Sequence, residues 1–377
     1  MNSRERVLAA INHKEPDRVP LYFGGTSSFM TDEAYFQLKD YLGITGDVEA
    51  YREGHTGNYF DQRILEALDA DVRFVHMKKA AATPVRRIDE NTVLCDWGVP
   101  IRKIDGYGVR VDPPLAHATK SDIACHPWPD PYDPGRTAGL ALAARTLREQ
   151  TDKAVVARSP QSASFLEYGA WLRGMEQFLM DLLLDRGFAE ALLDKILDLQ
   201  IGFYDALLTE VGRYVDIVET AEDYGTQNGL LISPQLFRDI IKPRRKAIND
   251  FIRKKAPGAK ILHHSCGAIE PIITDLVEVG VDILNPVQPL PNMNPSEIKK
   301  KYGDKVVLCG GVDMQNTGLQ DPYLLEQEVV LRIEQLASGG GYLFAPSNHI
   351  QPDLPTRSVV ALFALAKKHG VYGRNEA

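Results

Sequence analysis

The stretch "KILHHSCGAI", residues 260 to 269, begins as an apolar run and ends in a cluster of polar side chains. A short apolar run that is followed by a turn residue, here Gly267, is typical of a buried strand. His264 and Cys266 are two positions apart, so they point to the same face of such a strand. A histidine nitrogen and a cysteine sulfur on one face are a ligand pair for zinc, and the alternative is a core cysteine beside a hydrogen-bonded histidine.

Seven similar β-rich runs occur elsewhere in the chain, at residues 19–23, 71–77, 154–159, 214–220, 281–286, 305–311 and 341–347. Their apolar residues are continuous rather than alternating, as expected of strands that are buried on both faces. Helical patterns separate the runs, and one of them begins with Ser233 and Pro234, a pair that favours the start of a helix. Strands alternating with helices in this way predict an α/β fold, a (β/α)8 TIM barrel, as a single domain over residues 1–377.

The longest interruption of this alternation lies between the second and third predicted strands, at about residues 90–135. Turn glycines, several prolines and alternating residues fill it. We predict a β-hairpin followed by an extended proline-rich loop, inserted within the same domain.

The composition limits the classes of function. The chain has 377 residues, of which 44% are apolar and 25% charged, which is ordinary for a globular protein with a large core. Its net charge is −8 and no block of basic residues occurs, so we expect neither nucleic acid nor a membrane surface as a partner. Four cysteines in so long a chain do not indicate a disulfide framework. The N-terminus has no apolar signal core and no apolar run reaches about 18 residues, so we expect a cytoplasmic protein.

A barrel of this class gathers its chemistry at the carboxyl ends of its strands. Polar side chains follow the predicted strands at those ends, namely Ser159, Gln161, Ser162, Asn285, Gln288, Cys309, Asp313, Ser347, Asn348 and His349. Glu219, Glu222 and Asp223 follow the fourth strand. We predict Glu219 and Asp223 as catalytic residues, because adjacent carboxyl groups supply general acids and bases. The alternative is that these acidic residues cap a helix and face solvent.

A catalytic zinc site needs about three protein ligands and one open position. For the third ligand we predict His349, because prolines stiffen its loop, "APSNHIQPD", which follows the last strand. Cys309 and the carboxylates of Glu219 and Asp223 are the alternatives, and His349 would then only anchor its loop. His263 alternates to the opposite face of its strand, so we expect it to be structural.

Four segments of the chain resemble the uroporphyrinogen decarboxylase superfamily: "RVLAAINHKEPDRVP", "GLLISPQLFRDIIKPRRK", "HHSCGAIEPIITDLVEVGVDILNPVQ" and "GGGYLFAPSNHIQPDLP". The resemblance covers about residues 3–372 and implies a (β/α)8 barrel. One branch of this superfamily decarboxylates uroporphyrinogen without a cofactor and binds its carboxylates with arginines of a motif resembling RQAGRY. The equivalent stretch here, "LYFGGTSSFM", contains no arginine.

The other branch comprises zinc-dependent methyltransferases that work with a corrinoid. Their zinc is held by a His-x-Cys pair, which His264 and Cys266 match, and by a later cysteine in a loop resembling APGC. This chain has "APSNH" there, with Asn348 in place of the cysteine and His349 next to it. Either His349 replaces the thiolate, or the third ligand comes from elsewhere, or the metal is lost.

The resemblance implies transfer of a methyl group between a small methylated substrate and a corrinoid (cobalamin) that a partner protein carries, with zinc (Zn²⁺) in the site. A site that contains nitrogen or carboxylate ligands beside one sulfur suits oxygen, so we expect demethylation of an O-methyl compound. We expect Asn285, Gln288 and Asn348 to contact the cofactor.

Two other functions remain open at this point. One is a metal-free lyase resembling uroporphyrinogen decarboxylase, and the other is a non-catalytic protein that binds a tetrapyrrole or corrinoid. A homodimer is a candidate assembly.

Overall fold

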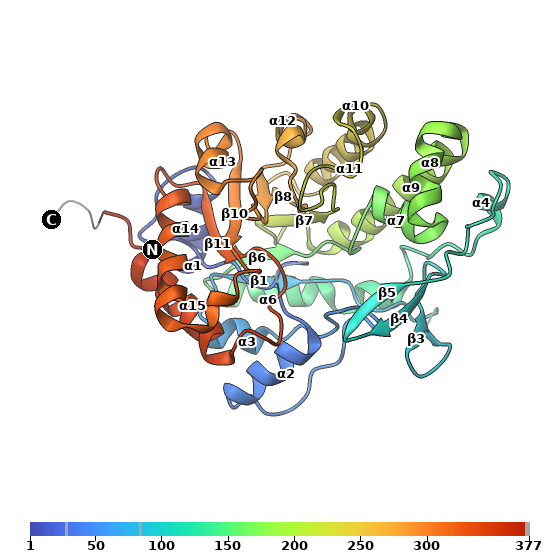
Figure 1. Ribbon diagram of the computed structural model, residues 1–377. Helices are drawn as coiled ribbons and strands as arrows, with labels where there is room; N and C mark the ends of the chain where they lie inside the picture. Colours follow the sequence, from blue (N-terminus) through green and yellow to red (C-terminus); the bar gives the residue numbers. More distant parts are fainter. Residues whose placement is uncertain (27–28, 83–84, 374–377) are drawn as a thin grey trace.

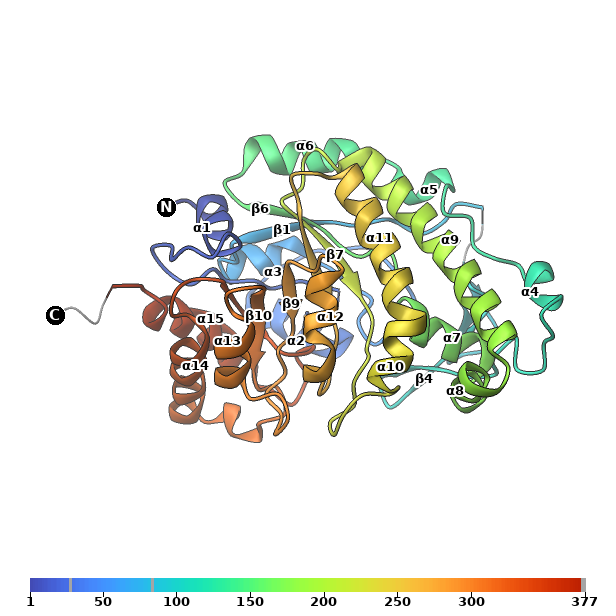
Figure 2. The same ribbon diagram turned by 90° about the horizontal axis from the view of Figure 1, so that it is seen from above.

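The core of the protein is a curled, parallel β-sheet of seven strands (Figures 1 and 2). The computed structural model describes residues 1–26, 29–82 and 85–373. In spatial order the strands are β1 Val72–Val75, β6 Ala154–Ala157, β7 Ile217–Ala221, β8 Lys260–His264, β9 Ile283–Asn285, β10 Val307–Val312 and β11 Tyr342–Pro346. Almost every residue in these strands is buried, which explains why the sequence shows continuous apolar runs. The prediction of an α/β fold with a parallel sheet is confirmed.

The apolar run at 19–23 does not form a regular strand, so the prediction of eight regular strands is wrong in this one place. Leu21 makes a single parallel bridge with Phe344 of β11. On the other side, the amide of Asp71 donates to the carbonyl of Leu21 at 3.0 Å. Pro20 lacks an amide hydrogen and so cannot donate to a strand ladder, which limits the pairing of this run.

Helices lie along the outer side of the sheet (Figure 2). In chain order they are α1 Ser3–Ala10, α2 Asp32–Tyr41, α3 Gln62–Ala67, α4 Asp122–Cys125, α5 Pro134–Thr137, α6 Leu140–Gln150, α7 Phe165–Arg173, α8 Met175–Leu184, α9 Arg186–Val211, α10 Pro234–Leu236, α11 Lys242–Lys255, α12 Ile273–Glu278, α13 Pro295–Tyr302, α14 Pro322–Leu336 and α15 Thr356–His369. Short η segments are η1 Phe237–Ile241, η2 Glu270–Ile272 and η3 Thr317–Gln320.

The longest helix, α9, illustrates how the sequence forms these elements. Its N-terminus is capped by Asp185, whose carboxylate accepts the amide hydrogen of Phe188. Leu192, Ile196 and Phe203 recur at helical spacing and are fully buried. The helix therefore turns one apolar face to the sheet and to α11, against which it packs.

Between β1 and β6 the chain forms a separate antiparallel sheet of β2 Arg86–Arg87, β3 Thr92–Leu94, β4 Pro100–Ile104 and β5 Tyr107–Arg110. It lies apart from the parallel sheet at the right of Figure 1. Asp105 and Gly106 join β4 to β5, both with positive φ (48° and 86°), as a tight two-residue hairpin turn requires. This sheet positions Trp97 and Arg110 over the carboxyl ends of the parallel strands, where both line a cavity.

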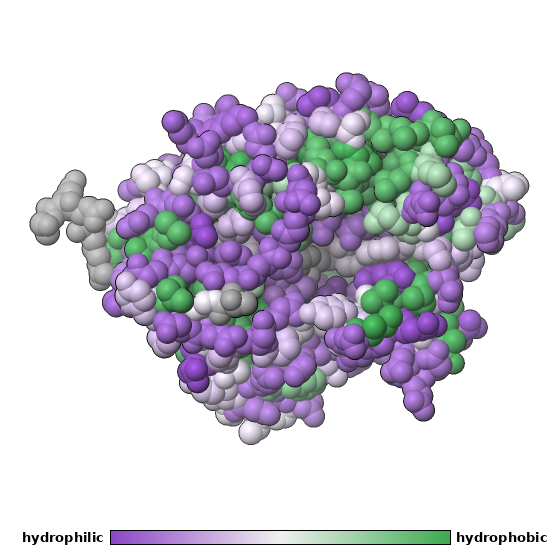
Figure 3. All heavy atoms as spheres, in the orientation of Figure 1, coloured by the Kyte–Doolittle hydropathy of each residue, from purple (hydrophilic) through white to green (hydrophobic). Residues whose placement is uncertain are grey.

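Helix α8 carries an exposed apolar surface. Figure 3 shows apolar side chains gathered over α8, at the upper right of the view, where Met175, Met180, Leu183 and Leu184 are exposed. No helix among the described residues is both long and apolar enough to cross a membrane.

Candidate functional site

His264, Cys266 and Asp223 form a cluster at the carboxyl ends of β7 and β8. The two strands pair in parallel with Ala221 opposite His264, so the residues two positions further along, Asp223 and Cys266, also lie side by side. The Nε2 atom of His264 lies 3.3 Å from Sγ of Cys266 and 3.7 Å from Oδ1 of Asp223. The nitrogen, sulfur and oxygen ligand atoms of the three residues all lie within 4.8 Å of one another.

Asn285 orients the imidazole of His264. It ends β9, where the strand register places it opposite His264, and its Oδ1 lies 2.6 Å from Nδ1 of His264. The amide nitrogen of Asn285 donates to the carbonyl of Cys309 at 3.2 Å, so Oδ1 is the end that accepts from His264. Nδ1–H of His264 therefore donates to Asn285, and Nε2 faces Cys266 and Asp223.

Cys266 lies in an acidic surrounding. Its backbone N–H donates to Oδ1 of Asp223 at 2.7 Å, and the side-chain amide nitrogen of Asn348 lies 3.5 Å from its Sγ. Burial, followed by the negative charges of Asp223 and Glu167, raises the pKa of Cys266 well above its usual value. A thiolate therefore needs a cation at this position to be stable.

Glu167 is a residue of the site that the sequence analysis missed. It lies in the first turn of α7 rather than at the end of a strand, and its Oε2 accepts the amide hydrogen of Asp223 at 3.2 Å. Burial, and then the charges of Asp223 and Glu222, raise the pKa of Glu167 well above its usual value. Glu167 is therefore a carboxyl group that gives up its proton less readily than an exposed glutamate does. Its position in the sequence, next to apolar Leu166 and Tyr168, carries no signal of this role.

Glu219 was predicted as a catalytic residue together with Asp223, but the two lie in different surroundings. The carboxylate of Glu219 is buried and accepts from Tyr22 Oη at 2.6 Å, Thr26 Oγ1 at 2.8 Å and Thr26 N at 3.2 Å. These contacts tie the segment after residue 20 to β7. The side chain of Asp223 is 40% exposed and reaches the cluster.

His349 lines the same cavity as the cluster but is not one of its three members. Its Nδ1 accepts the amide hydrogen of Phe29 at 3.3 Å, so Nε2 is the nitrogen that remains for a ligand. Burial, with the charges of Arg52 and Arg158, lowers the pKa of His349 to about 3, so the imidazole is neutral. The predicted role of His349 as a metal ligand stays a prediction.

Cys309 is fully buried in β10, where the side-chain amide nitrogen of Asn285 donates to its sulfur. Burial raises the pKa of the Cys309 thiol. It is not part of the cluster. His263 lies on the opposite face of β8 from His264, as the alternation of a strand predicts, and its Nδ1 lies 2.7 Å from Oγ1 of Thr220.

Three residues were predicted to contact the cofactor. Asn348 lines the cavity, whereas Asn285 is hydrogen-bonded to His264 and Gln288 to the backbone of Gly267. Oε1 of Gln288 accepts the amide hydrogen of Gly267 at 3.0 Å. Gly267 has a φ of +90°, and a Cβ there would lie 2.4 Å from the backbone of Gly225. Only glycine fits this turn, which directs the chain away after Cys266.

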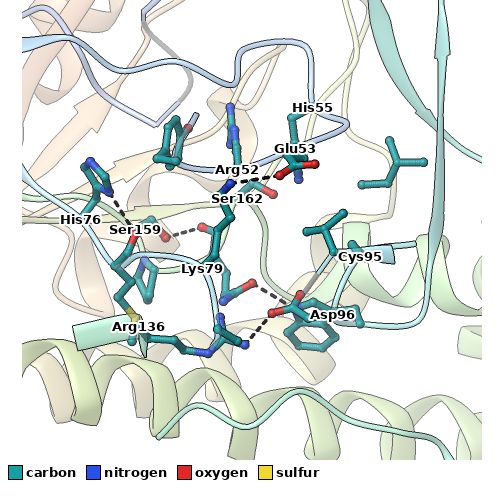
Figure 4. Close-up of a pocket in the computed structure, with 18 of the residues that line it drawn as sticks. Arg52, Glu53, His55, His76, Lys79, Cys95, Asp96, Arg136, Ser159 and Ser162 are labelled. Carbon is teal, nitrogen blue, oxygen red and sulfur yellow. Dashed lines mark hydrogen bonds and ion pairs between the residues drawn. The ribbon is translucent and has the colours of Figure 1, made fainter. Parts of the chain in front are cut away.

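The site opens into two adjoining cavities. One has a volume of about 300 Å³ and is lined by the cluster, Glu167 and His349. The other has a volume of about 140 Å³ and is lined by residues of the antiparallel sheet, of the loop that follows β6 and of α7 (Figure 4). Thr26, Arg52, His55, Arg110, Ser162 and Trp171 line both. A small molecule in the second cavity therefore has a path to the cluster.

Comparison with known proteins identifies the family. The profile of uroporphyrinogen decarboxylase (URO-D) matches residues 88–369, which is more than half of the chain. The chain therefore belongs to the uroporphyrinogen decarboxylase family, and the resemblance seen in the sequence is confirmed. No curated protein sequence matches this chain.

Among solved structures, a methyltransferase from Methanosarcina mazei has a similar fold, with a TM-score of 0.65 and 18% sequence identity. The match covers 98% of this chain and 99% of that one. At this identity the likeness is one of fold.

Proposed function

We propose that this member of the uroporphyrinogen decarboxylase family is a zinc-dependent methyltransferase. It takes a methyl group from a small O-methylated compound and passes it to a corrinoid carried by a partner protein. The observation that carries the proposal is the cluster of His264, Cys266 and Asp223, in which the Nε2 lone pair faces the sulfur and the carboxylate. The similar fold of a methyltransferase supports the same reading.

The two separations from Nε2 of His264 fit zinc. Two ligands that lie about 2.0–2.3 Å from one tetrahedral ion are about 3.4–3.6 Å from each other. The Nε2–Sγ and Nε2–Oδ1 distances, 3.3 Å and 3.7 Å, need little adjustment to reach this geometry. The hydrogen bond from His264 to Asn285 is also the kind of contact that fixes a ligating histidine.

Zinc, when bound, supplies a Lewis acid that withdraws charge from the atom that carries the methyl group. The mixed set of nitrogen, sulfur and carboxylate ligands is harder than a set of three sulfurs, which favours an oxygen atom in that place. Glu167 lies in the same cavity and its pKa is raised, so in this proposal it is the general acid that gives a proton to the oxygen once the methyl group has left and the electrons of the C–O bond remain on that oxygen.

A partner protein requires a surface on which to dock. Helix α8 follows α7 after a single residue, and α7 carries Tyr168 and Trp171 into the cavity wall. The exposed apolar side chains of α8 therefore lie on an element connected to the site (Figure 3). Exposed apolar patches of this kind are typical of protein–protein contacts, which supports this surface as the place where the corrinoid protein binds.

A metal-free carboxy-lyase is the second candidate, and the family match favours it. One observation speaks for methyl transfer instead. Asp223, one of the two carboxylates that a lyase would use as general acid or base, accepts the backbone amide hydrogen of Cys266 and lies 3.7 Å from the imidazole of His264.

The test is the metal content of the purified protein, measured by elemental mass spectrometry after purification without chelators and with added zinc. We expect about one zinc per chain in the wild type and in Cys125→Ala, a control at an exposed cysteine. His264→Ala and Cys266→Ala should lose it. Assays with a corrinoid protein, using methyl ethers and methylated thiols as donors, should then show transfer from the ethers. Absence of zinc from the wild type would contradict the proposal and favour the lyase.

A further inference from the structure

Three arginines line the smaller cavity without an acidic partner. Arg52 donates Nε–H to the carbonyl of Gly57 at 2.6 Å. Arg110 and Arg158 likewise donate to backbone carbonyls, of Gly108 at 2.9 Å and of Gly25 at 3.2 Å. Within the ranges that the structure describes, none of the three guanidinium groups forms an ion pair with Asp or Glu. Three positive charges in one cavity repel one another, so the protein keeps them there against an energetic penalty.

Arg158 is the most deeply placed of the three. It is 3% exposed, and its guanidinium lies over the rings of Tyr51 and Phe60, at 4.8 Å and 4.7 Å from their centres. Its Nη1 has no hydrogen-bond partner among the described residues, and neither has Nε of Arg110. Buried donors and buried charges normally find a partner, so these two groups are arranged for one that comes from outside the chain.

Two other cations of the same cavity are paired. Lys79 lies 3.0 Å from Glu53, and Arg136 lies 2.6 Å from Asp96, as the dashed lines in Figure 4 show. The protein therefore neutralises the charges on these parts of the wall and leaves those of Arg52, Arg110 and Arg158 unbalanced. The missing charge is that of an anionic ligand.

The size and the walls of the cavity indicate which class of anion it binds. Its volume, about 140 Å³, is close to the ~150 Å³ of an apolar cavity that binds benzene. Trp97 and Tyr168 stack at 3.8 Å and line it, and Trp171 lies 4.1 Å from the guanidinium of Arg110. A flat aromatic ring fills such a space, and the fork of a guanidinium binds a carboxylate with two parallel hydrogen bonds.

We propose that the smaller cavity binds an aromatic carboxylic acid, with its ring against Trp97 and Tyr168 and its carboxylate held by Arg52, Arg110 and Arg158. This inference rests on the function proposed above: the acid is the methyl donor, and its O-methyl group points to the cluster where the two cavities adjoin. The substrate class is thus that of methoxylated aromatic acids.

Calorimetric binding of small probes to the purified protein tests this inference. The probes are the three methoxybenzoate isomers, the matching neutral methoxybenzamides and inorganic phosphate. We expect at least one acid to bind about tenfold or more tightly than its amide, because the amide cannot form charge-assisted hydrogen bonds. Phosphate should bind more weakly than that acid. No preference for any acid, or tighter binding of phosphate, would overturn the proposal.

Two variants connect the preference to the arginines. Arg52→Gln and Arg158→Gln should each remove most of the preference for the acid over the amide. Arg102→Gln, at an exposed arginine of the antiparallel sheet, is the matched control and should retain it. Circular dichroism identifies a variant that has not folded, and Arg52, which is less buried than Arg158, keeps the test available if Arg158→Gln unfolds. Unchanged preference in folded Arg52→Gln would contradict the assignment.

The same measurement in Cys266→Ala separates this inference from the proposed function. The anion site, formed by Arg52, Arg110 and Arg158, does not include the cluster. The variant should therefore still prefer the acid although it has lost zinc. A preference for the acid without any methyl transfer would refute the methyltransferase and leave the anion site in place. Methyl transfer from neutral ethers with no preference for acids would refute the site for an aromatic acid and leave the methyltransferase in place.

Discussion

The amide oxygen of Asn285 lies 2.6 Å from Nδ1 of His264, and this contact decides which nitrogen of the imidazole faces Cys266. The other end of the Asn285 amide is fixed by the carbonyl of Cys309, so the orientation cannot reverse without losing a buried hydrogen bond. As a result, Nε2 of His264 presents a lone pair to the cluster before any ligand arrives.

Replacing Asn285 should therefore weaken metal binding. In Asn285→Ala the imidazole is free to change its proton position and orientation, and the affinity for zinc should fall about 10- to 100-fold. Asn285→Asp keeps an oxygen opposite Nδ1 and should lose much less. Competition of each protein with a chromophoric zinc chelator measures the affinities. Equal affinity of the alanine variant and the wild type would show that the contact does not orient the ligand.

The third ligand should be identified by thermodynamic linkage. Zinc at about 100 times its dissociation constant should raise the free energy of unfolding by about 2.7 kcal/mol in the wild type. We expect Asp223→Asn to lose most of this increase, because the carboxylate belongs to the cluster. His349→Gln should lose less, since His349 lines the cavity but is not one of the three clustered residues. Denaturation with and without zinc gives the comparison, and a larger loss in His349→Gln would make His349 the third ligand.

Glu219 should matter for stability. Its carboxylate accepts from Tyr22 and twice from Thr26 in a buried place. In Glu219→Gln a new amide donor faces these donors, so the free energy of unfolding should fall by about 1–3 kcal/mol. Glu66→Gln, at an exposed position of α3, is the control. Urea denaturation measures both, and a variant that is as stable as the control but inactive would instead make Glu219 catalytic.

His76 should make the stability depend on pH. Burial, and then the charge of Arg158, lower the pKa of His76 to about 4 in the folded protein, against an ordinary value of 6.5. Between these values the unfolded chain binds more protons, so the free energy of unfolding should fall as the pH is lowered from 6.5 towards 4. One proton corresponds to a slope of at most about 1.4 kcal/mol per pH unit.

Urea denaturation at several pH values in this range measures the effect. His76→Asn should show a shallower slope than the wild type, whereas His117→Asn, at an exposed histidine, should not. Equal slopes in the wild type and in His76→Asn would mean that His76 is not responsible.

The parts of the site that the sequence predicted are those that depend on residues close to one another in the chain. His264 and Cys266 face the same side because side chains of a strand alternate, and His263 faces the other side for the same reason. The run at 19–23 is apolar like the others, yet it makes only one bridge, because pairing depends also on Pro20 and on what lies beside it. Pro20 is visible in the run itself, but the segments that lie beside the run are not.

The sequence alone determined the alternation of buried strands and helices, the family, and the His-x-Cys pair, because each follows from short-range periodicity or from a contiguous motif. Only the tertiary structure decided that Asp223 completes the cluster, since the register between β7 and β8 brings it beside Cys266. It also brought Glu167 from α7, and gathered Arg52, Arg110 and Arg158 in one cavity although the first and the last are 106 positions apart in the sequence. Contacts between segments so distant depend on packing and register, and no local spacing of residues encodes them.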